Sequence, residues 1–226
     1  MLLATILIAA EMLTNPHLEG ADSSGKITGW SRPSRHYLYV TSGGFDGSGC
    51  LTYENADETD YYGLPSQVIP VGPGRKYQLT AWAKSGLTSG QVNVCFEWVD
   101  SSDKYISGRY ISLGDVAQGT DGEWHQMTIV TPRMPETAVR AHISLYCSKG
   151  ALGTARWDEV SVTRVIEPVV PGFFTDAYRE TAADSDPPVT FRGVLNLADY
   201  DLTADEVRAD LSWTDVGGMP RRIEVT

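Results

Sequence analysis

The sequence predicts an all-β fold of antiparallel strands, either a sandwich or a barrel. The 226 residues include 22 Gly and 12 Pro, and they contain no long run with a clean helical period. Turn signals recur about every ten residues, which is typical of all-β sandwiches and barrels. Between the turns, apolar and polar residues alternate, as expected for antiparallel sheets with one buried face. Hydrophobic residues make up 42% of the chain, which is enough for a packed core.

The expected strands follow one another from Leu13 to Val165. We expect roughly nine to eleven of them, separated by loops of the length found in hairpins and crossovers. The first is a short strand at Leu13 that breaks into a turn at Asn15-Pro16. The later strands are expected at residues 36–41, 50–54, 67–71, 76–84, 91–99, 105–113, 124–131, 139–147 and 156–165.

The last expected strand carries a carboxylate in an unusual position. Asp158 shares the parity of Val160 and Val162, so we expect its side chain to point to the apolar side of the sheet. An unpaired buried carboxylate is costly, and a cation should meet it there. A bound Ca²⁺ with Glu19 as a second ligand would satisfy Asp158. The alternatives are hydration at the mouth of the strand and pairing with an arginine.

The two ends of the chain differ from its middle. Residues 1–12 resemble the apolar core of a secretory signal without its positively charged segment, or else form a first strand. Residues 167–172 contain closely spaced prolines and predict a stiff linker. Residues 173–226 predict about three strands, at 189–197, 207–213 and 221–226, and therefore an incomplete second β domain that is covalently linked downstream.

The formal net charge of −11 limits the partners of this protein. Nucleic acid is excluded because its phosphates would be repelled, and so is a basic membrane-surface domain. No membrane insertion is expected, since the apolar run at the start is too short to span a bilayer. An acidic surface suits a secreted or cell-surface protein that binds neutral ligands or cations.

Three cysteines, Cys50, Cys95 and Cys147, cannot all pair within one chain. No Cys-x-x-Cys motif or Cys/His cluster indicates a zinc site. A bridge between Cys95 and Cys147 would need a bulge, because their parities relative to the apolar residues of their strands are opposite. We expect all three to be free.

Motifs of known catalytic sites are absent from the sequence. It contains no Gly-x-Ser-x-Gly, His-Glu-x-x-His, phosphate-binding loop or Gly-x-Gly-x-x-Gly. The 29 Asp and Glu residues include no evident pair of the kind that glycoside hydrolysis needs. We therefore expect the visible chain to be non-catalytic.

Four short motifs occur in a fixed order. They are Asn15-Pro-His-Leu-Glu19 with Gly29-Trp30, Pro73 to Lys84, Trp124 to Met127 with Pro132, and Trp157-Asp-Glu-Val160. In this order they resemble the galactose-binding-like jelly-roll carbohydrate-binding modules that bind xylans and β-glucans, the type of families 4, 9 and 22. Pro132 departs from the pattern, since it lies two positions early. The resemblance implies an antiparallel two-sheet jelly-roll β-sandwich over residues 13–166, followed by the start of a second β-sandwich.

The resemblance also implies a structural Ca²⁺ that joins the opening acidic residue to the closing one. Its side-chain ligands would be Glu19 and Asp158, both of which are present. A backbone carbonyl around His17 and another in the loop before Trp30 would complete the shell. Hard oxygen ligands of this kind suit Ca²⁺ better than a transition metal.

In the modules that the chain resembles, sugar binds on the concave face of one sheet and beneath an overhanging loop. Strand parity places His142 and Tyr146 on the outward side of one strand, and Asn93 and Glu97 on the outward side of another. The resemblance adds two loop aromatics before Gly63. The candidate ligand-binding residues are therefore Tyr61, Tyr62, Asn93, Glu97, His142 and Tyr146. The alternatives are a packed tyrosine, an exposed histidine and a solvated carboxylate at these positions.

The tryptophans divide between core and surface. The resemblance implies that Trp30, Trp82 and Trp124 pack in the core, and parity predicts the same for Trp98. Trp157 has the parity opposite to Val160, which predicts that it reaches the concave face unless a bulge intervenes.

These expectations favour a non-catalytic carbohydrate-binding module that targets a polysaccharide-active enzyme to plant-type or related glycans. The first alternative is a cell-surface adhesion or spacer β-sandwich that binds protein. The second is a small enzyme of unrecognised type. Exposed aromatic side chains on the concave face would favour the module.

Overall fold

The structure is a computed structural model that describes residues 10–31, 34–57, 63–113, 122–166, 172–175, 191–194, 209–214 and 219–225. The chain forms two compact units, one of residues 5–165 and one of residues 1–4 with 166–226. Strands and no helices are found among the described residues, so the all-β class is confirmed.

The larger unit is built from the strands β1 to β9. They are β1 Tyr37–Val40, β2 Cys50–Asn55, β3 Ser66–Pro70, β4 Lys76–Ser89, β5 Val92–Val99, β6 Tyr105–Leu113, β7 Trp124–Val130, β8 Arg140–Cys147 and β9 Leu152–Val165. The prediction of a strand at Leu13 is wrong, because residues 13–17 form bends and turns instead. Glu11 makes an isolated bridge to Thr163, and this contact attaches the first described segment to β9.

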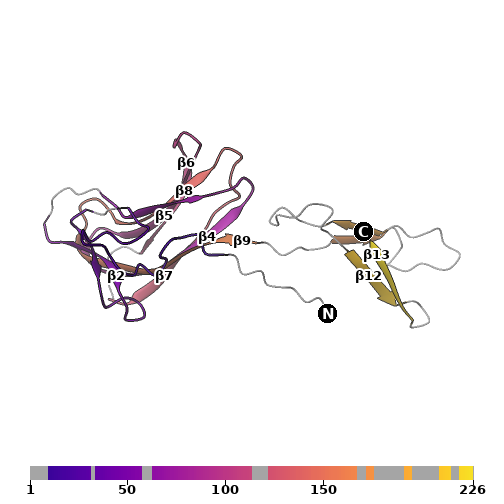
Figure 1. Cartoon of the computed structure of the whole chain (residues 1–226), viewed down its shortest axis with the longest axis horizontal. Helices are drawn as coiled ribbons and strands as arrows, with labels where there is room; N and C mark the ends of the chain where they lie inside the picture. Colours follow the sequence, from indigo (N-terminus) through magenta and orange to yellow (C-terminus); the bar gives the residue numbers. More distant parts are fainter. Residues whose placement is uncertain are drawn as a thin grey trace. The chain divides into compact units, whose positions relative to one another are not determined.

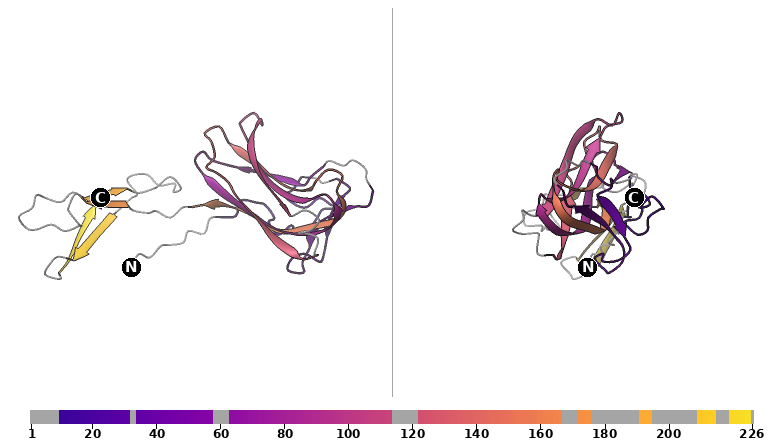
Figure 2. Two further views of the ribbon diagram at one scale, coloured as in Figure 1. Left: turned by 180° about the vertical axis from the view of Figure 1, so that it is seen from behind. Right: turned by 90° about the vertical axis from the view of Figure 1, so that its left-hand side faces the viewer.

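The nine strands form two antiparallel sheets that lie face to face (Figures 1 and 2). One has the order β1-β2-β9-β4-β7 and the other the order β3-β8-β5-β6. Chain neighbours therefore often belong to different sheets, since β2 and β3, β6 and β7, and β8 and β9 each cross from one sheet to the other. This is the jelly-roll β-sandwich that the sequence motifs predict.

The core fills the space between the two sheets. In β4, every second side chain from Tyr77 to Leu87 is buried, which reproduces the period of two that the sequence shows. The predicted inward sets of β5 and β8 are confirmed: Val92, Val94, Phe96, Ala141, Ile143 and Leu145 are all at most 1% exposed. Trp30 and Trp98 are buried in the core, as expected.

A bulge in β9 overturns two of the expectations about that strand. Trp82 pairs with Asp158 but Thr80 pairs with Ser161, so β9 carries an extra residue there. Glu159 has a φ of 48°, in the left-handed region. The bulge reverses the parity of the strand. Trp157 is therefore buried in the core rather than on the concave face, and Asp158 points away from the core side that Val160 occupies.

The outer face of the five-stranded sheet holds two tryptophans that were expected in the core. Trp82 and Trp124 are only partly buried, because they lie on the same outer face as Asp158. Phe45 stacks on Trp82 with ring centroids 3.9 Å apart and meets Trp124 edge-on at 6.2 Å. The loop that carries Phe45 thus covers part of this face.

The smaller unit contains two strand pairs among its described residues. β10 Gly172–Thr175 pairs with β11 Phe191–Val194, and β12 Ala209–Thr214 pairs with β13 Pro220–Val225, both antiparallel. Three of these strands lie where the sequence predicts them, and β10 begins at the last residue of the expected linker. The rest of that linker, residues 167–171, lies outside the described residues, as do residues 1–9.

Within the described part of the chain, no helix has the length and apolar character needed to cross a membrane.

Candidate functional site

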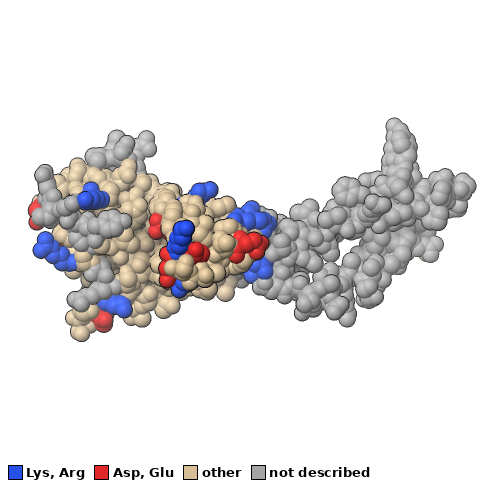
Figure 3. Space-filling view, turned by 90° about the horizontal axis from the view of Figure 1, so that it is seen from above, with Lys and Arg blue, Asp and Glu red and all other residues tan. Residues whose placement is uncertain are grey.

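The outer face of the sheet β3-β8-β5-β6 brings the predicted sugar-binding strands together. β8 and β5 are neighbours in this sheet, with Asn93 opposite Tyr146 and Glu97 opposite His142. Their side chains share the face that points away from the core, as parity predicts. In Figure 3, seen from the side on which Figure 1 labels β6 and β8, scattered basic and acidic side chains interrupt a mainly uncharged surface.

Two tyrosines that the sequence analysis missed lie on β6 at the edge of this face. Tyr105 is 54% exposed and Tyr110 is 51% exposed. Register places Tyr110 opposite Cys95, in the same outward row as Asn93 and Glu97. The alternation of β6 gives the parity of Tyr110, but only the pairing of β6 with β5 shows that it joins this face.

Tyr110 is held in place by Glu97 and by a glycine. The Tyr110 hydroxyl donates a short hydrogen bond to Glu97 Oε1, and the Tyr105 hydroxyl lies 3.4 Å from that of Tyr110. Gly108 pairs with Glu97, and a Cβ at Gly108 would lie 2.9 Å from the Tyr110 hydroxyl and 3.1 Å from Glu97 Cγ. The space above Gly108 is therefore where the tyrosine and the glutamate meet. Desolvation and the bond to Glu97 raise the pKa of Tyr110, so its hydroxyl keeps its proton and remains a donor.

Asn93 lies on the predicted face but is not an open polar group. It is 5% exposed, its Nδ2 donates to the Gln91 carbonyl at 3.0 Å, and its Oδ1 accepts from Ser112 Oγ at 2.6 Å. Asn93 is therefore held within the sheet, and its contact with a ligand stays a prediction. His142, Tyr146 and Glu97 are each partly exposed on the same face. Tyr61 and Tyr62 lie outside the described residues.

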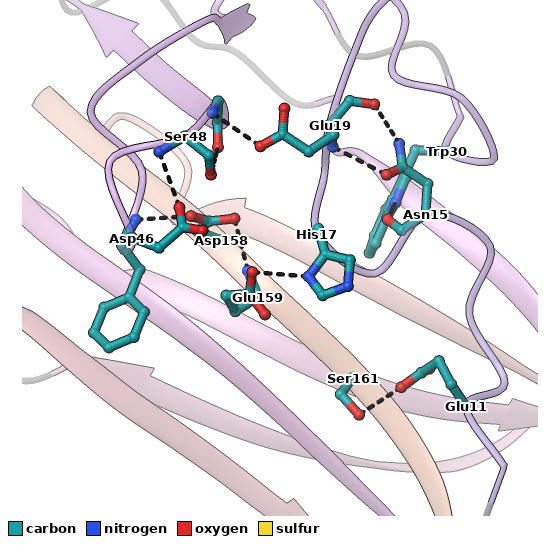
Figure 4. A network of polar contacts seen from close by, with 12 residues as sticks. Glu11, Asn15, His17, Glu19, Trp30, Asp46, Ser48, Asp158, Glu159 and Ser161 are labelled. Atoms are coloured by element: carbon teal, nitrogen blue, oxygen red, sulfur yellow. Dashed lines mark hydrogen bonds and ion pairs between the residues drawn. The ribbon is translucent and has the colours of Figure 1, made fainter.

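The structure also brings the two predicted calcium ligands to one loop, residues 43–49 (Figure 4). Glu19 Oε1 accepts from the Gly49 backbone N–H at 2.9 Å, and Asp158 Oδ2 accepts from the Phe45 backbone N–H at 2.7 Å. The Pro16 carbonyl accepts from the Val160 N–H at 2.8 Å, which fixes the opening segment against β9. The expected proximity of these distant segments is confirmed.

Three oxygens converge beside Gly44 within this loop. A Cβ at Gly44 would press against Asp158 Oδ2 and would lie 2.6 Å from the Gly49 carbonyl oxygen and 3.0 Å from that of Ser48. Carboxylate and carbonyl oxygens around one small space are the ligand type that Ca²⁺ prefers. Asp158 and the two carbonyls are therefore of the ligand type that the expected ion needs. Among the described residues, no three His, Cys, Asp or Glu side chains form a cluster that could hold a metal, so backbone carbonyls would have to complete the shell.

Asp158 is completely buried, and among the described residues its hydrogen-bond donors are the backbone N–H groups of Phe45 and Glu159. Burial raises the pKa of Asp158 from 3.8 to about 6, against the lowering effect of these two bonds. The buried carboxylate that the sequence predicts is thus present, although on the outer face of its sheet rather than on the core side.

His17 is committed to an ion pair through its ring. His17 Nδ1 lies 2.8 Å from Glu159 Oε1, and this hydrogen bond raises the pKa of His17. The expected role of His17 as a metal ligand belongs to its backbone carbonyl and not to this ring, and it stays a prediction. The three cysteines are free, as predicted, and all three are buried.

Comparison with known proteins bears on the fold. No family model and no curated protein matches the chain. An arabinose-bound α-L-arabinofuranosidase has a TM-score of 0.50 and 12% identity over 69% of this chain and 26% of its own. The enzymatically active domain of bacteriophage CBA120 tailspike protein 4 has a TM-score of 0.49 and 16% identity over 66% of this chain and 22% of its own. This chain therefore spans about a quarter of the length of these two structures.

Carbohydrate-binding modules are also among the similar structures. The module TmCBM61, in complex with β-1,4-galactotriose, has a TM-score of 0.48 and 16% identity over 70% of this chain and 100% of its own. The CBM22-1 xylan-binding domain of Paenibacillus barcinonensis Xyn10C has a TM-score of 0.47 and 15% identity over 70% of this chain and 97% of its own. The likeness concerns the fold alone, and the chain has the jelly-roll fold that the motifs predict.

Proposed function

We propose that residues 13–166 form a non-catalytic carbohydrate-binding module that holds a polysaccharide chain on the outer face of β3-β8-β5-β6. The observation that carries the proposal is the pair of exposed tyrosines, Tyr105 and Tyr110, beside Glu97 on this face. Sugars present C–H patches on their faces and hydroxyls at their rims. Exposed aromatic rings suit the C–H patches, and planar polar groups suit the hydroxyls.

Each group on this face has a chemical task in the proposal. The rings of Tyr105 and Tyr110 stack against sugar faces. The Tyr110 hydroxyl donates its hydrogen bond to Glu97 Oε1, so the second carboxylate oxygen of Glu97 accepts from a sugar hydroxyl. His142, which lies opposite Glu97, supplies a further polar edge. Each hydroxyl exchanges water for a protein partner at a net gain of roughly 0.5–1.5 kcal/mol, so the affinity is modest.

The proposal extends to the setting of the module. A bound Ca²⁺ at Glu19, Asp158 and the nearby carbonyls would stabilise the sandwich by tying the opening segment to β9. The protein is secreted or displayed at the cell surface, and the module brings a polysaccharide-active partner in the same polypeptide to plant-type or related glycans. The acidic chain, with a net charge of −11, supports a neutral rather than a polyanionic ligand.

The test is calorimetric titration of the chain with xylan and β-glucan oligosaccharides, comparing wild type with Tyr110→Ala and Tyr105→Ala. We expect each variant to bind several-fold more weakly while its melting temperature stays near that of the wild type, since both rings are exposed. Equal affinities in all three proteins would rule out this face. Absence of any glycan binding by the wild type would favour a protein-binding surface instead.

A further inference from the structure

A second polar site lies on the other sheet of the sandwich. A cavity of about 620 Å³ is lined by Arg35, His36, residues 54–57, Thr88 and residues 152–154. These residues belong to the segment before β1 and to the ends of β2, β4 and β9, all in the five-stranded sheet. The lining includes no residue of β3, β8, β5 or β6, so the cavity is separate from the proposed glycan-binding face.

The guanidinium group of Arg35 lines the cavity. The described part of the protein orients this group through one hydrogen bond and leaves its other N–H donors unused. The backbone N–H of Glu54 donates to the His36 carbonyl at 2.9 Å, and His36 Nδ1 lies 3.0 Å from the Glu54 carbonyl oxygen. A proton on Nδ1 satisfies this second contact, which leaves Nε2 to accept from Arg35 Nε at 3.4 Å. No other hydrogen bond or ion pair links Arg35 to the described residues. The terminal nitrogens of its guanidinium are therefore available to a ligand.

A free carboxylate lines the same cavity. The Glu54 side chain makes no hydrogen bond or ion pair with the described residues, and it does not pair with Arg35. The cavity thus combines a fork of N–H donors with two acceptor oxygens that the fold leaves unpaired. A ligand that both donates and accepts hydrogen bonds can engage both groups at once.

Hydrogen bonds and a close backbone approach hold the floor of the cavity. Asn55 Nδ2 donates to the Ala151 carbonyl at 2.9 Å and to the Tyr53 hydroxyl at 3.1 Å, so the end of β2 is tied to the residues before β9. Gly153 has a φ of 106°, and a Cβ there would lie 2.6 Å from the Gly86 carbonyl oxygen. Only glycine permits this close approach of β9 to β4. A preorganised site of this kind loses little conformational entropy on binding.

The charges of the lining select the class of ligand. Arg35 contributes one positive charge, while Glu54 and Asp57 contribute two negative charges, so phosphate, sulfate and acidic sugars are disfavoured. Among the described residues, the lining contains no Trp, Tyr or Phe, so this part of the chain offers no such ring on which the face of an internal sugar could stack. Donors and acceptors without a stacking ring suit a ligand that is recognised by its hydroxyls.

We propose that this cavity binds one terminal residue of a neutral glycan through its hydroxyl groups. Arg35 donates to hydroxyl oxygens, Glu54 accepts from hydroxyl protons, and Thr88 and Thr154 contribute their own hydroxyls at the rim. This site holds the end of a chain, whereas the tyrosine-bearing face holds its interior. The site does not depend on the proposed function of that face, because the two share no residue.

The test is a heteronuclear NMR titration of the full chain with D-xylose, D-galactose, D-glucose and L-arabinose. We expect at least one sugar to shift the backbone signals of Thr88, Gly153 and Thr154, in the wild type and in Tyr110→Ala alike. Arg35→Ala and Glu54→Gln should each weaken this binding about tenfold or more, the loss of roughly one charge-assisted hydrogen bond. Arg75→Ala is the matched control, since Arg75 precedes β4 at the end opposite to Thr88.

Three outcomes would overturn the proposal. The first is that none of the four sugars shifts the cavity signals at millimolar concentration. The second is that the shifts persist unchanged in both Arg35→Ala and Glu54→Gln. The third is that inorganic phosphate binds there more tightly than the sugars do. Loss of binding in Tyr110→Ala with unchanged cavity shifts would affect only the first glycan-binding face, so failures of the two proposals are distinguishable.

Discussion

Gly108 lies directly beneath the hydroxyl of Tyr110, and a Cβ at this glycine would come within 2.9 Å of that oxygen. The absence of a side chain on one strand residue therefore allows a tyrosine two positions further along to reach Glu97 on the neighbouring strand. The face of β3-β8-β5-β6 owes its arrangement to this glycine as much as to its aromatic residues.

The first prediction concerns Gly108→Ala. The new methyl group would displace the Tyr110 hydroxyl and press on Glu97 Cγ, at 3.1 Å, so the hydrogen bond between the two side chains should break. Both neighbouring side chains lie on the solvent side of the sheet and can turn away, so the melting temperature should change little. We expect affinity for the glycan that the wild type binds to fall several-fold in a calorimetric titration.

The matched control for this variant is Gly72→Ala. A Cβ at Gly72 would lie 3.5 Å from Arg75 Cγ, which is ordinary van der Waals contact. Its glycan affinity should equal that of the wild type. If Gly108→Ala also binds like the wild type, the bond between Tyr110 and Glu97 does not organise the site.

The second prediction concerns the pH dependence of stability without calcium. Burial raises the pKa of Asp158 from 3.8 to about 6 in the folded protein, so the folded state binds more protons than the unfolded state within that interval. The contribution of Asp158 to the free energy of unfolding should therefore fall as the pH rises through the interval between these two pKa values. A bound Ca²⁺ would favour the ionised carboxylate and remove this loss.

The measurements are chemical denaturation from pH 4 to pH 7 and thermal melting, each in chelator and in calcium, with Asp158→Asn as the control that cannot titrate. In chelator, the wild type should lose more stability with rising pH than Asp158→Asn does. Calcium should raise the melting temperature of the wild type and leave that of Asp158→Asn nearly unchanged. A wild-type melting temperature that chelator does not alter would show that calcium is not structural here.

The alternation of residues predicted most of the fold, because the period of two in β4, β5 and β8 determines which side chains fill the core. It failed at β9, where one extra residue at Glu159 reverses the parity. The sequence carries no signal for that bulge, because the residue type of Glu159 does not indicate a left-handed backbone. A glutamate at this position is equally compatible with a regular strand. Asp158 was therefore predicted as buried for the wrong reason.

Local patterns could not show how strands are ordered within a sheet. Glu97 and His142 meet because β5 pairs with β8, which parity allowed as a hypothesis. Tyr110 joins them because β6 pairs with the other side of β5, and nothing in the alternation of β6 determines that neighbour. Likewise, the burial of Asn93 follows from Ser112 on β6, a contact that a single strand cannot reveal.

The third prediction concerns the loop over the five-stranded sheet. Phe45 stacks on Trp82 with ring centroids 3.9 Å apart, and its backbone N–H donates to Asp158. Phe45→Ala removes the ring contact, which is worth about 0.5–1.5 kcal/mol beyond the buried area. Because Phe45 is 41% exposed, we expect the free energy of unfolding to fall by about 1–2 kcal/mol, less than for a fully buried aromatic side chain.

Phe45→Leu is the control, because it keeps apolar cover over Trp82 without the stacked ring. Its loss of stability should be smaller than that of Phe45→Ala in the same denaturation experiment. Tryptophan fluorescence should shift to longer wavelength in Phe45→Ala, as Trp82 becomes hydrated. Unchanged stability and fluorescence would mean that the loop does not pack on this sheet in solution.

The last prediction concerns the beginning of the folded unit, which the sequence placed at Leu13. Glu11 accepts hydrogen bonds from the Ser161 hydroxyl at 2.6 Å and from the Val162 N–H at 3.0 Å. The Met12 N–H donates to the Val162 carbonyl at 2.9 Å. These bonds attach the segment of Glu11 and Met12 to the edge of β9. The attachment lies near the bulge, where the pairing of β9 with β4 changes register.

A chain of residues 10–166 should therefore melt at a higher temperature than a chain of residues 13–166. Loss of one hydrogen bond to a charged group costs about 1.5–3 kcal/mol of the free energy of unfolding. Because Glu11 is exposed, we expect a loss at the lower end of this range. Glu11→Gln in the longer chain separates the contribution of the backbone bridge from that of the Glu11 carboxylate. The variant keeps the bridge and weakens the hydrogen bonds to Ser161 and Val162. Its melting temperature should lie between those of the two chains, and equal melting temperatures for all three would place the boundary at Leu13 after all.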